Sequence, residues 1–385
     1  MRSLDREQLD AALVDARQYT NACLAHLTPA QWQVPRLLIL NPPQWEIGHV
    51  GWFQEYWCLR RPRPDEAPSP SRRDGVDALY DSRSVAHATR WDLPLLTLDE
   101  TARYLDDTLQ ATRAALAAGD TSDDALYRFR LALYHEEMHG EALVQVCHAL
   151  HYARPACLPR GRPLPARGGE ALVPGGTVTL GATGTGGFAF DNEQQAHALT
   201  LAPYRIGRDL VTAGGYERFV LAGGYARDEL WTPEGRTWRD AAGATLPSTW
   251  RRAARGFEVR EFDAWSPLDR NAPLLHVTLH EARAYCAWAG RRLPTEAEWE
   301  HAARSGAIAW GYAWEWTATP FAPYPGFVPG RYAEYSAPWF YTHQAVRGAS
   351  HVTRPRLRNP GYRNFYLPER ADVFIGFRTC AIDPR

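Results

Sequence analysis

The chain has 385 residues, which is long enough for two domains with separate hydrophobic cores. Its 43 Lys and Arg residues nearly balance its 44 Asp and Glu residues, and no basic stripe stands out, so the composition argues against a nucleic-acid partner. No apolar run approaches membrane-spanning length, and the first residues do not form a signal sequence. We therefore expect a cytoplasmic protein without nucleic-acid or membrane partners, of unknown oligomeric state.

The first 157 residues have the periodicity of a helical bundle. Apolar residues recur at helical spacing over about 5–27, and Thr28-Pro29 ends that run. A second helix is predicted from Pro42 to about residue 59, followed by a loop rich in Pro, Ser and Arg that extends to residue 73. Thr97 and Glu100 have the spacing of a capping box and open a third helix to about 118, and a fourth is expected over about 123–151. Four long helices predict an up-down bundle.

Three histidines of this region are candidate metal ligands. His135 and His139 are four residues apart in the fourth helix, so they share one helix face. His49 lies in the second helix among apolar and small residues. Facing helices of a bundle can bring such side chains together. Three neutral imidazoles with positions left open are typical of a catalytic metal site.

Two other interpretations of these histidines remain open. His135, Glu136 and His139 match the zinc-protease pattern, in which the glutamate is the general base. Metzincin-type proteases need a third histidine shortly downstream, and residues 140–145 do not supply one. Alternatively, the histidines are helix-surface residues that bind no metal. In that case the presence of a third candidate ligand, His49, is a coincidence.

Beyond Cys157 the composition changes. Residues 158–169 are rich in Pro, Gly and Arg and are expected to form an interdomain linker. Gly, Pro, Trp and Tyr are dense in residues 170–385, where we predict short strands, long loops and one clearly helical stretch over 278–303. The sequence therefore predicts an α+β protein with a bundle over 1–157, a linker over 158–169 and a second domain over 170–385. The six scattered cysteines are expected to be reduced core residues.

The second domain resembles a known family. The run from Val277 to Glu300 is similar to the hallmark of formylglycine-generating-enzyme-type (sulfatase-modifying-factor) domains, and the resemblance covers about 170–382. Further matching segments are Phe190-Asp191-Asn192-Glu193, Gly223-Gly224-Tyr225, Trp314-Glu315-Trp316-Thr317, Arg347-Gly348-Ala349-Ser350 and Gly376-Phe377-Arg378. The resemblance implies a fold like that of C-type lectins. Formylglycine-generating activity is not expected, because that family uses a cysteine pair near the C-terminus and only Cys380 lies there.

A bundle resembling the DinB type ahead of such a domain is the architecture of the EgtB-like sulfoxide synthases. The resemblance implies a non-haem Fe(II) held by His49, His135 and His139, with Glu141 at the last position of the family's histidine motif. It also implies that O2 is a co-substrate. The enzymes of this family join a chalcogen donor to the imidazole of hercynine, the trimethylated betaine of histidine.

The resemblance also suggests substrate-binding and catalytic residues. Asn364 and Phe365 match the family's Asn-aromatic pair, which contacts hercynine. Aromatic faces and amide donors suit a ligand that carries a trimethylammonium group and a carboxylate. Tyr324 is the expected counterpart of a tyrosine that donates a proton near the iron, with Tyr332 and Tyr335 as competitors.

Departures from the ergothioneine enzymes bear on the chalcogen donor. Met138 stands where the histidine motif usually has a glutamine, and Tyr366 replaces an aspartate that holds the donor's amino group. The loop over 82–94 lacks the arginine-rich pattern that binds a donor carboxylate, and Arg90 is the nearest counterpart. These changes favour the selenoneine synthase (SenA) branch with a selenosugar donor over an ergothioneine-type enzyme that uses γ-glutamylcysteine or cysteine. A zinc hydrolase and a non-catalytic sugar-binding module are the alternatives from other classes.

Overall fold

The computed structural model describes residues 2–61, 67–159, 165–184 and 187–382. The chain divides into two compact units. The bundle unit consists of Met1–Pro159, Gly186–Phe188 and Thr353–Leu357, and the sheet unit contains the remaining residues. Residues 160–164 of the predicted linker and residues 62–66 of the predicted Pro-rich loop lie outside the described residues.

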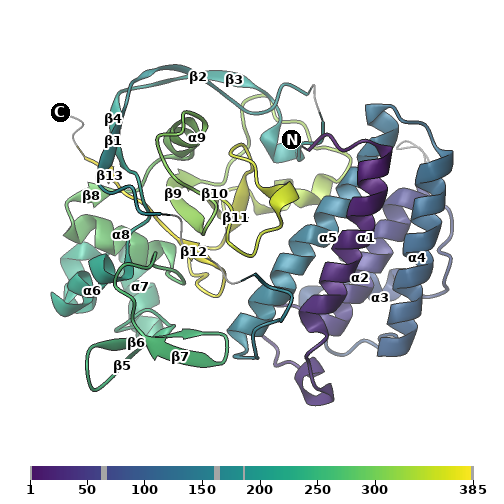
Figure 1. Ribbon diagram of the computed structural model, residues 1–385, viewed down its shortest axis with the longest axis horizontal. Helices are drawn as coiled ribbons and strands as arrows, with labels where there is room; N and C mark the ends of the chain where they lie inside the picture. The colour runs from purple at the N-terminus through teal and green to yellow at the C-terminus, as the bar shows by residue number, and fades with distance from the viewer. Residues whose placement is uncertain (1, 62–66, 160–164, 185–186, 383–385) are drawn as a thin grey trace. The chain divides into compact units, whose positions relative to one another are not determined.

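Four long helices lie side by side in the bundle unit (Figure 1), as predicted. Contacts join α1 to α5 and to α4, and α2 to both α4 and α5. The helices are α1 (Arg6–Leu24), α2 (Pro43–Glu55), the short α3 (Val76–Tyr80), α4 (Leu98–Ala118) and α5 (Asp123–Ala149). The end of the second predicted helix, Tyr56–Arg60, continues α2 as a π-helical turn.

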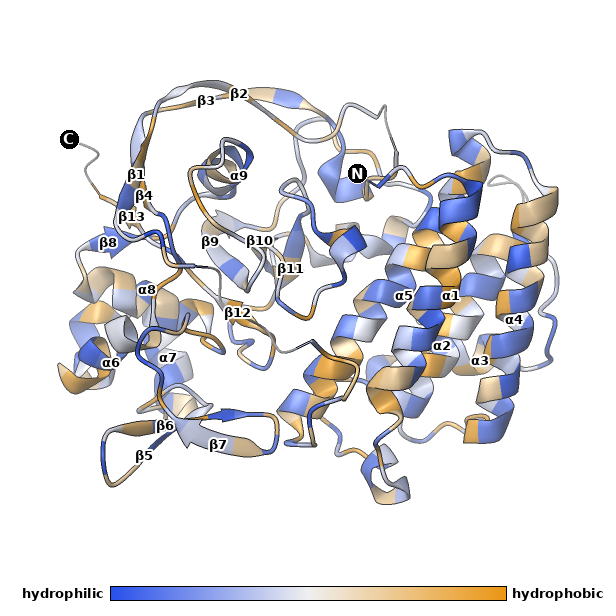
Figure 2. Ribbon diagram, in the orientation of Figure 1, coloured by the Kyte–Doolittle hydropathy of each residue, from blue (hydrophilic) through white to orange (hydrophobic). Residues whose placement is uncertain are grey.

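Local sequence signals explain where these helices begin and which side is buried. The Thr97 hydroxyl accepts a hydrogen bond from the Glu100 backbone N–H, which confirms the predicted capping box. On α1, Leu9, Leu13 and Ala16 recur at three- to four-residue spacing and are buried. Figure 2 shows hydrophilic residues on the other sides of the same helix.

The described residues of the sheet unit form four small sheets. Two have four strands, in the orders β1-β4-β13-β8 and β11-β10-β9-β12, one joins β2 to β3, and one has the order β5-β6-β7. All pairs are antiparallel except β12 with β9. The strands are β1 (Glu170–Val173), β2 (Gly176–Leu180), β3 (His197–Leu201), β4 (Tyr204–Gly207), β5 (Trp250–Arg252), β6 (Phe257–Glu261), β7 (Ala264–Pro267), β8 (Arg291–Arg292), β9 (Trp314–Pro320), β10 (Gln344–Gly348), β11 (Asn364–Tyr366), β12 (Ile375–Gly376) and β13 (Cys380–Ala381). Helices beside short strands confirm the predicted α+β class.

The helical content of the sheet unit was underestimated from the sequence. The predicted stretch over 278–303 is two helices, α8 (Leu279–Trp288) and α9 (Glu296–Arg304), separated by β8. Two more helices, α6 (Ala213–Leu221) and α7 (Pro233–Ala242), were not predicted. Gly214 and Gly215 give α6 a low intrinsic propensity, but the Thr212 side chain caps its first turn and Tyr216 packs in the core.

Buried ion pairs hold the sheet unit together. Three arginines with at most 1% of their surface exposed each bind a buried glutamate: Arg347 with Glu300, Arg363 with Glu296, and Arg378 with Glu315. Arg378 is bidentate, with Nε 2.6 Å from one Glu315 oxygen and its second contact at 2.8 Å. Several residues that carry the family resemblance therefore have structural partners in the core.

Glu281 in α8 gives a testable pH dependence of stability. It is buried, accepts hydrogen bonds from Tyr225 and Thr278, and burial raises its pKa from an ordinary value of 4.5 to about 7. The folded state therefore holds more protons than the unfolded state between these pH values, so the free energy of unfolding falls as pH rises from 4.5 to about 7.

We expect Glu281→Gln to remove this decline, because the amide oxygen can still accept the capping hydrogen bonds without a charge. Urea unfolding at pH 4.5, 6 and 8 measures it. The variant should gain stability relative to the parent protein as the pH rises. Parallel pH profiles for the two proteins would contradict the assignment.

No helix of the described residues is long and apolar enough to cross a membrane.

All six cysteines are free, and five of them are buried. Cys157 is partly exposed, and its Sγ lies 3.8 Å from the Sγ of Cys23.

Candidate metal centre

The structure brings His49, His135 and His139 together in the bundle unit. His49 comes from α2 and the other two from α5, and one ring nitrogen of each lies within 4.8 Å of the others. The Nε2 atoms of His135 and His139 are 3.2 Å apart. His49 and His135 are buried, whereas His139 is partly exposed.

Backbone and carboxylate acceptors orient two of these rings. His49 Nδ1 lies 2.8 Å from the Tyr80 carbonyl oxygen, and His139 Nδ1 lies 2.7 Å from Glu46 Oε1. A carbonyl oxygen only accepts, so His49 Nδ1 is the donor in the first contact and its neutral ring keeps the lone pair on Nε2. The Glu46 contact fixes the orientation of the His139 ring in the same way, through Nδ1. Gly48 permits the first contact, because a Cβ there would lie 2.3 Å from the Tyr80 ring.

The surroundings keep His49 and His135 neutral. Burial lowers the pKa of both imidazoles well below the ordinary value, and the neighbouring His139 lowers it further. The Phe53 ring stacks on His135 with centroids 3.5 Å apart, and the Trp45 ring stacks on His49 at 4.8 Å. The aromatic walls hold both rings in place.

This donor set fits one metal ion. Neutral imidazole nitrogens suit iron, copper, nickel and zinc. Nitrogens bound to one ion at about 2.1 Å lie roughly 3 Å apart, close to the separation of His135 and His139. Three protein ligands leave further positions open for small molecules.

Glu136 does not face this site. Its two oxygens accept hydrogen bonds from Arg17 Nε at 2.7 Å and from the Arg17 terminal nitrogen at 3.2 Å, and both side chains are buried. A zinc protease requires the glutamate as a general base on the metal-bound water. This geometry counts against the hydrolase interpretation.

Met138 and Arg90 also belong to the bundle unit. Met138 is half-buried next to His139 on α5. The Arg90 guanidinium lies 3.7 Å from the centre of the Trp45 ring and donates a hydrogen bond of 2.6 Å to Asn41. Arg90 therefore contacts Trp45, the tryptophan that stacks on His49.

The remaining predicted site residues belong to the sheet unit. On β11 the Asn364 amide lies 3.2 Å from the Tyr366 hydroxyl, whereas the Phe365 ring stacks on Phe321 with centroids 4.1 Å apart. Asn364 and Tyr366 therefore share one face of the strand and Phe365 occupies the other.

Tyr324 is buried, and the Arg363 guanidinium lies 3.8 Å above its ring. Its hydroxyl has no hydrogen-bond partner among the described residues. Burial raises the pKa of Tyr324, so the phenol stays protonated at neutral pH. Of its two competitors, Tyr335 is engaged with the Tyr362 hydroxyl at 3.2 Å.

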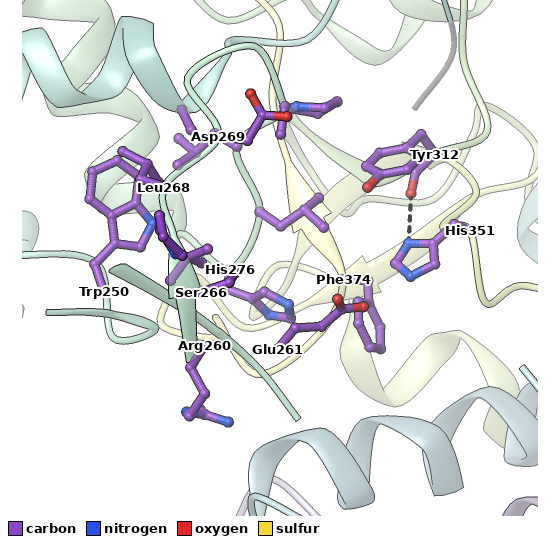
Figure 3. Close-up of a pocket in the computed structure, with 17 residues that line it drawn as sticks. Trp250, Arg260, Glu261, Ser266, Leu268, Asp269, His276, Tyr312, His351 and Phe374 are labelled. Carbon is purple, nitrogen blue, oxygen red and sulfur yellow. Dashed lines mark hydrogen bonds between the residues drawn. The ribbon is translucent and has the colours of Figure 1, made fainter. Parts of the chain in front are cut away.

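A cavity of about 230 Å³ in the sheet unit was not predicted from the sequence (Figure 3). Strands β5 to β7 form one wall, and Tyr312, His351 and Phe374 lie across from them. His276, which also lines it, has a left-handed backbone with φ of 61°. None of the predicted substrate residues lines this cavity.

Sequence reasoning did not single out Glu46 and Tyr80 as partners of the metal-ligand candidates. A signal for Glu46 exists, because it is an acid between the apolar residues Trp45 and Ile47 near the start of a predicted helix. Tyr80 acts through its backbone carbonyl, so its side-chain identity carries no signal.

Comparisons with known proteins agree with this architecture. The DinB superfamily model matches residues 12–143, and the sulfatase-modifying factor enzyme 1-like domain model matches residues 158–314. Hercynine oxygenase of Mycolicibacterium smegmatis is 33% identical, covering 88% of this chain and 91% of the relative. Hercynine oxygenase of Mycolicibacterium thermoresistibile is 31% identical, covering 97% and 94%. The formylglycine-generating enzyme of Streptomyces coelicolor matches only 42% of this chain, at 35% identity. The chain therefore belongs to the EgtB-like hercynine oxygenase family.

Proposed function

We propose that this protein uses Fe(II) and O2 to join a chalcogen donor to the imidazole of hercynine. The observation that carries the proposal is the convergence of His49, His135 and His139 as buried ligand candidates, two of them held neutral by burial. Relatives named hercynine oxygenase, aligned over most of the chain, support the substrate.

Ferrous iron, when bound to these histidines, supplies the redox chemistry that activates O2. Joining a Se–H or S–H donor to the imidazole carbon removes one hydrogen from each partner. With one O2 per turnover, transfer of one oxygen atom to the chalcogen and release of the other as water balances the reaction. Holding both substrates in one site provides the proximity.

Residues of the sheet unit are proposed to bind substrate and to move a proton. Asn364 and Phe365 would contact hercynine through an amide and an aromatic face. Tyr324 would donate a proton, which agrees with the burial that keeps its phenol protonated. Met138 and Arg90 of the bundle unit are proposed as further substrate-binding residues.

We favour a selenosugar as the donor and selenoneine-type chemistry. The support is that Tyr366 replaces the aspartate expected for an amino-thiol donor and that the Arg90 guanidinium is engaged with Asn41 and Trp45. A sugar presents hydroxyl groups, which a phenol can bind as donor or acceptor. The alternative is an ergothioneine-type enzyme that uses γ-glutamylcysteine or cysteine.

A competition experiment tests the proposal. Fe(II)-loaded protein receives hercynine, a selenosugar, γ-glutamylcysteine and cysteine together with O2, and mass spectrometry identifies the products. We expect the selenium adduct to dominate and to vanish without O2. Dominant sulfur adducts would support the ergothioneine-type alternative, and no adduct with any donor would refute the hercynine function.

A further inference from the structure

Glu46 is a buried carboxylate that lacks the partners such a group normally has. It lies on α2 one turn before His49, with 1% of its surface exposed. Its Oε1 accepts the hydrogen bond from His139 Nδ1 at 2.7 Å. Its Oε2 is buried and has no hydrogen-bond partner among the described residues.

Two other buried carboxylates of the bundle unit, Glu136 and Glu55, have partners on both oxygens. Glu136 binds Arg17 with both oxygens. Glu55, on the same helix as Glu46, accepts hydrogen bonds from Ser71 Oγ and the Arg72 N–H on one oxygen, and from the Tyr104 hydroxyl on the other. Within the described residues, the imidazole of His139 is the basic side chain that contacts Glu46.

A buried carboxylate oxygen without a hydrogen-bond partner is costly, and a cation held by the neighbouring histidines would compensate it. The imidazole of His139 connects Glu46 to the metal-ligand candidates. Its Nδ1 faces Glu46, and its Nε2 faces the other histidines. A carboxylate behind a metal-ligating histidine fixes the ring's tautomer and raises the basicity of the ligand nitrogen.

We propose that Glu46 is a positioning residue for the metal centre. It orients His139 through Nδ1, and its negative charge offsets part of the charge of a divalent cation held by the three histidines. The inference rests on the part of the proposed function that assigns a divalent metal to these histidines. It does not depend on hercynine or on the chalcogen donor.

Metal affinity of the folded protein tests the proposal, with Co(II) as a spectroscopic probe in place of Fe(II). Dissociation constants come from competition with a chromophoric chelator, and the visible absorption of bound Co(II) reports the ligand field. We expect Glu46→Gln, which keeps an acceptor oxygen but no charge, to weaken Co(II) binding about 10–100-fold. Glu46→Ala, which also loses the hydrogen bond, should weaken it more and change the spectrum, and Glu46→Asp should recover part of the affinity.

Glu55→Gln is the matched control, because it removes a buried charge from the same helix without touching a histidine of the triad. It should bind Co(II) like the parent protein. Circular dichroism establishes that each variant is folded. If Glu46 had a purely structural role, the Glu46 variants would have a lower Tm than the parent protein but the same Co(II) affinity. Unchanged affinity in folded Glu46→Gln and Glu46→Ala overturns the inference alone. If the parent protein binds no divalent metal, both the inference and the proposed function fail.

Discussion

Replacing His49 with alanine is expected to abolish divalent metal binding and all product formation. Loss of an outer partner of a metal ligand typically costs about 10–100-fold, and loss of a ligand itself should exceed that. The reason is geometric, because His49 supplies the one ligand nitrogen that α2 contributes to the histidine cluster. Metal content by mass spectrometry of the purified protein and single-turnover product formation measure the two effects.

Two further variants separate ligation from packing. His49→Phe keeps a ring between Trp45 and the other histidines but has no ligand nitrogen, so it should be folded and free of metal. His26→Ala is the control, because neither ring nitrogen of His26 has a hydrogen-bond partner among the described residues and it is not part of the cluster. Retention of the metal by folded His49→Phe would remove His49 from the site.

The helices of the bundle unit could be predicted from the sequence because several local signals indicate the same helices. Apolar residues at helical spacing, the Thr97 cap and the Thr28-Pro29 stop each point to the same helices, whose bounds differ from the prediction by a few residues. A four-residue separation also places His135 and His139 on one helix face without any tertiary information.

The partners of these residues could not be predicted, because they depend on packing between distant segments. Glu136 is one residue from His135 and must point to a different side of α5. That its partner is Arg17 follows only from the contact between α1 and α5. Likewise, Glu46 is near His49 in the sequence but binds His139 on another helix.

The sheet unit was harder to predict because tertiary contacts override weak local propensity. Helix α6 begins Ala213-Gly214-Gly215, a sequence that disfavours a helix, and it is stabilised by its cap and by buried aromatic residues. The strands of the sheet unit have two to seven residues. Strands this short show too little alternation of apolar and polar residues to be distinguished from loops. There, the family resemblance carried information that periodicity did not.

Removing the Arg17 side chain is expected to cause the largest loss of stability in the bundle unit. Arg17 is buried and its guanidinium also donates to the Leu105 carbonyl at 2.6 Å and to Gln54 Oε1 at 2.9 Å. Arg17→Met leaves the Glu136 carboxylate charged and without this partner, which typically costs about 3–5 kcal/mol. Urea unfolding at pH 7 measures the change.

The double variant Arg17→Met/Glu136→Met tests the cause. Replacing both partners of a buried ion pair with apolar side chains is often close to neutral, so the double variant should recover most of the lost stability. A double variant no more stable than Arg17→Met would show that the loss comes from the Leu105 and Gln54 contacts instead. The same pair also tests function, because a hydrolase would lose its general base with Glu136→Met. If Glu136 is structural, the folded double variant should still form the hercynine product, since neither residue is part of the histidine cluster.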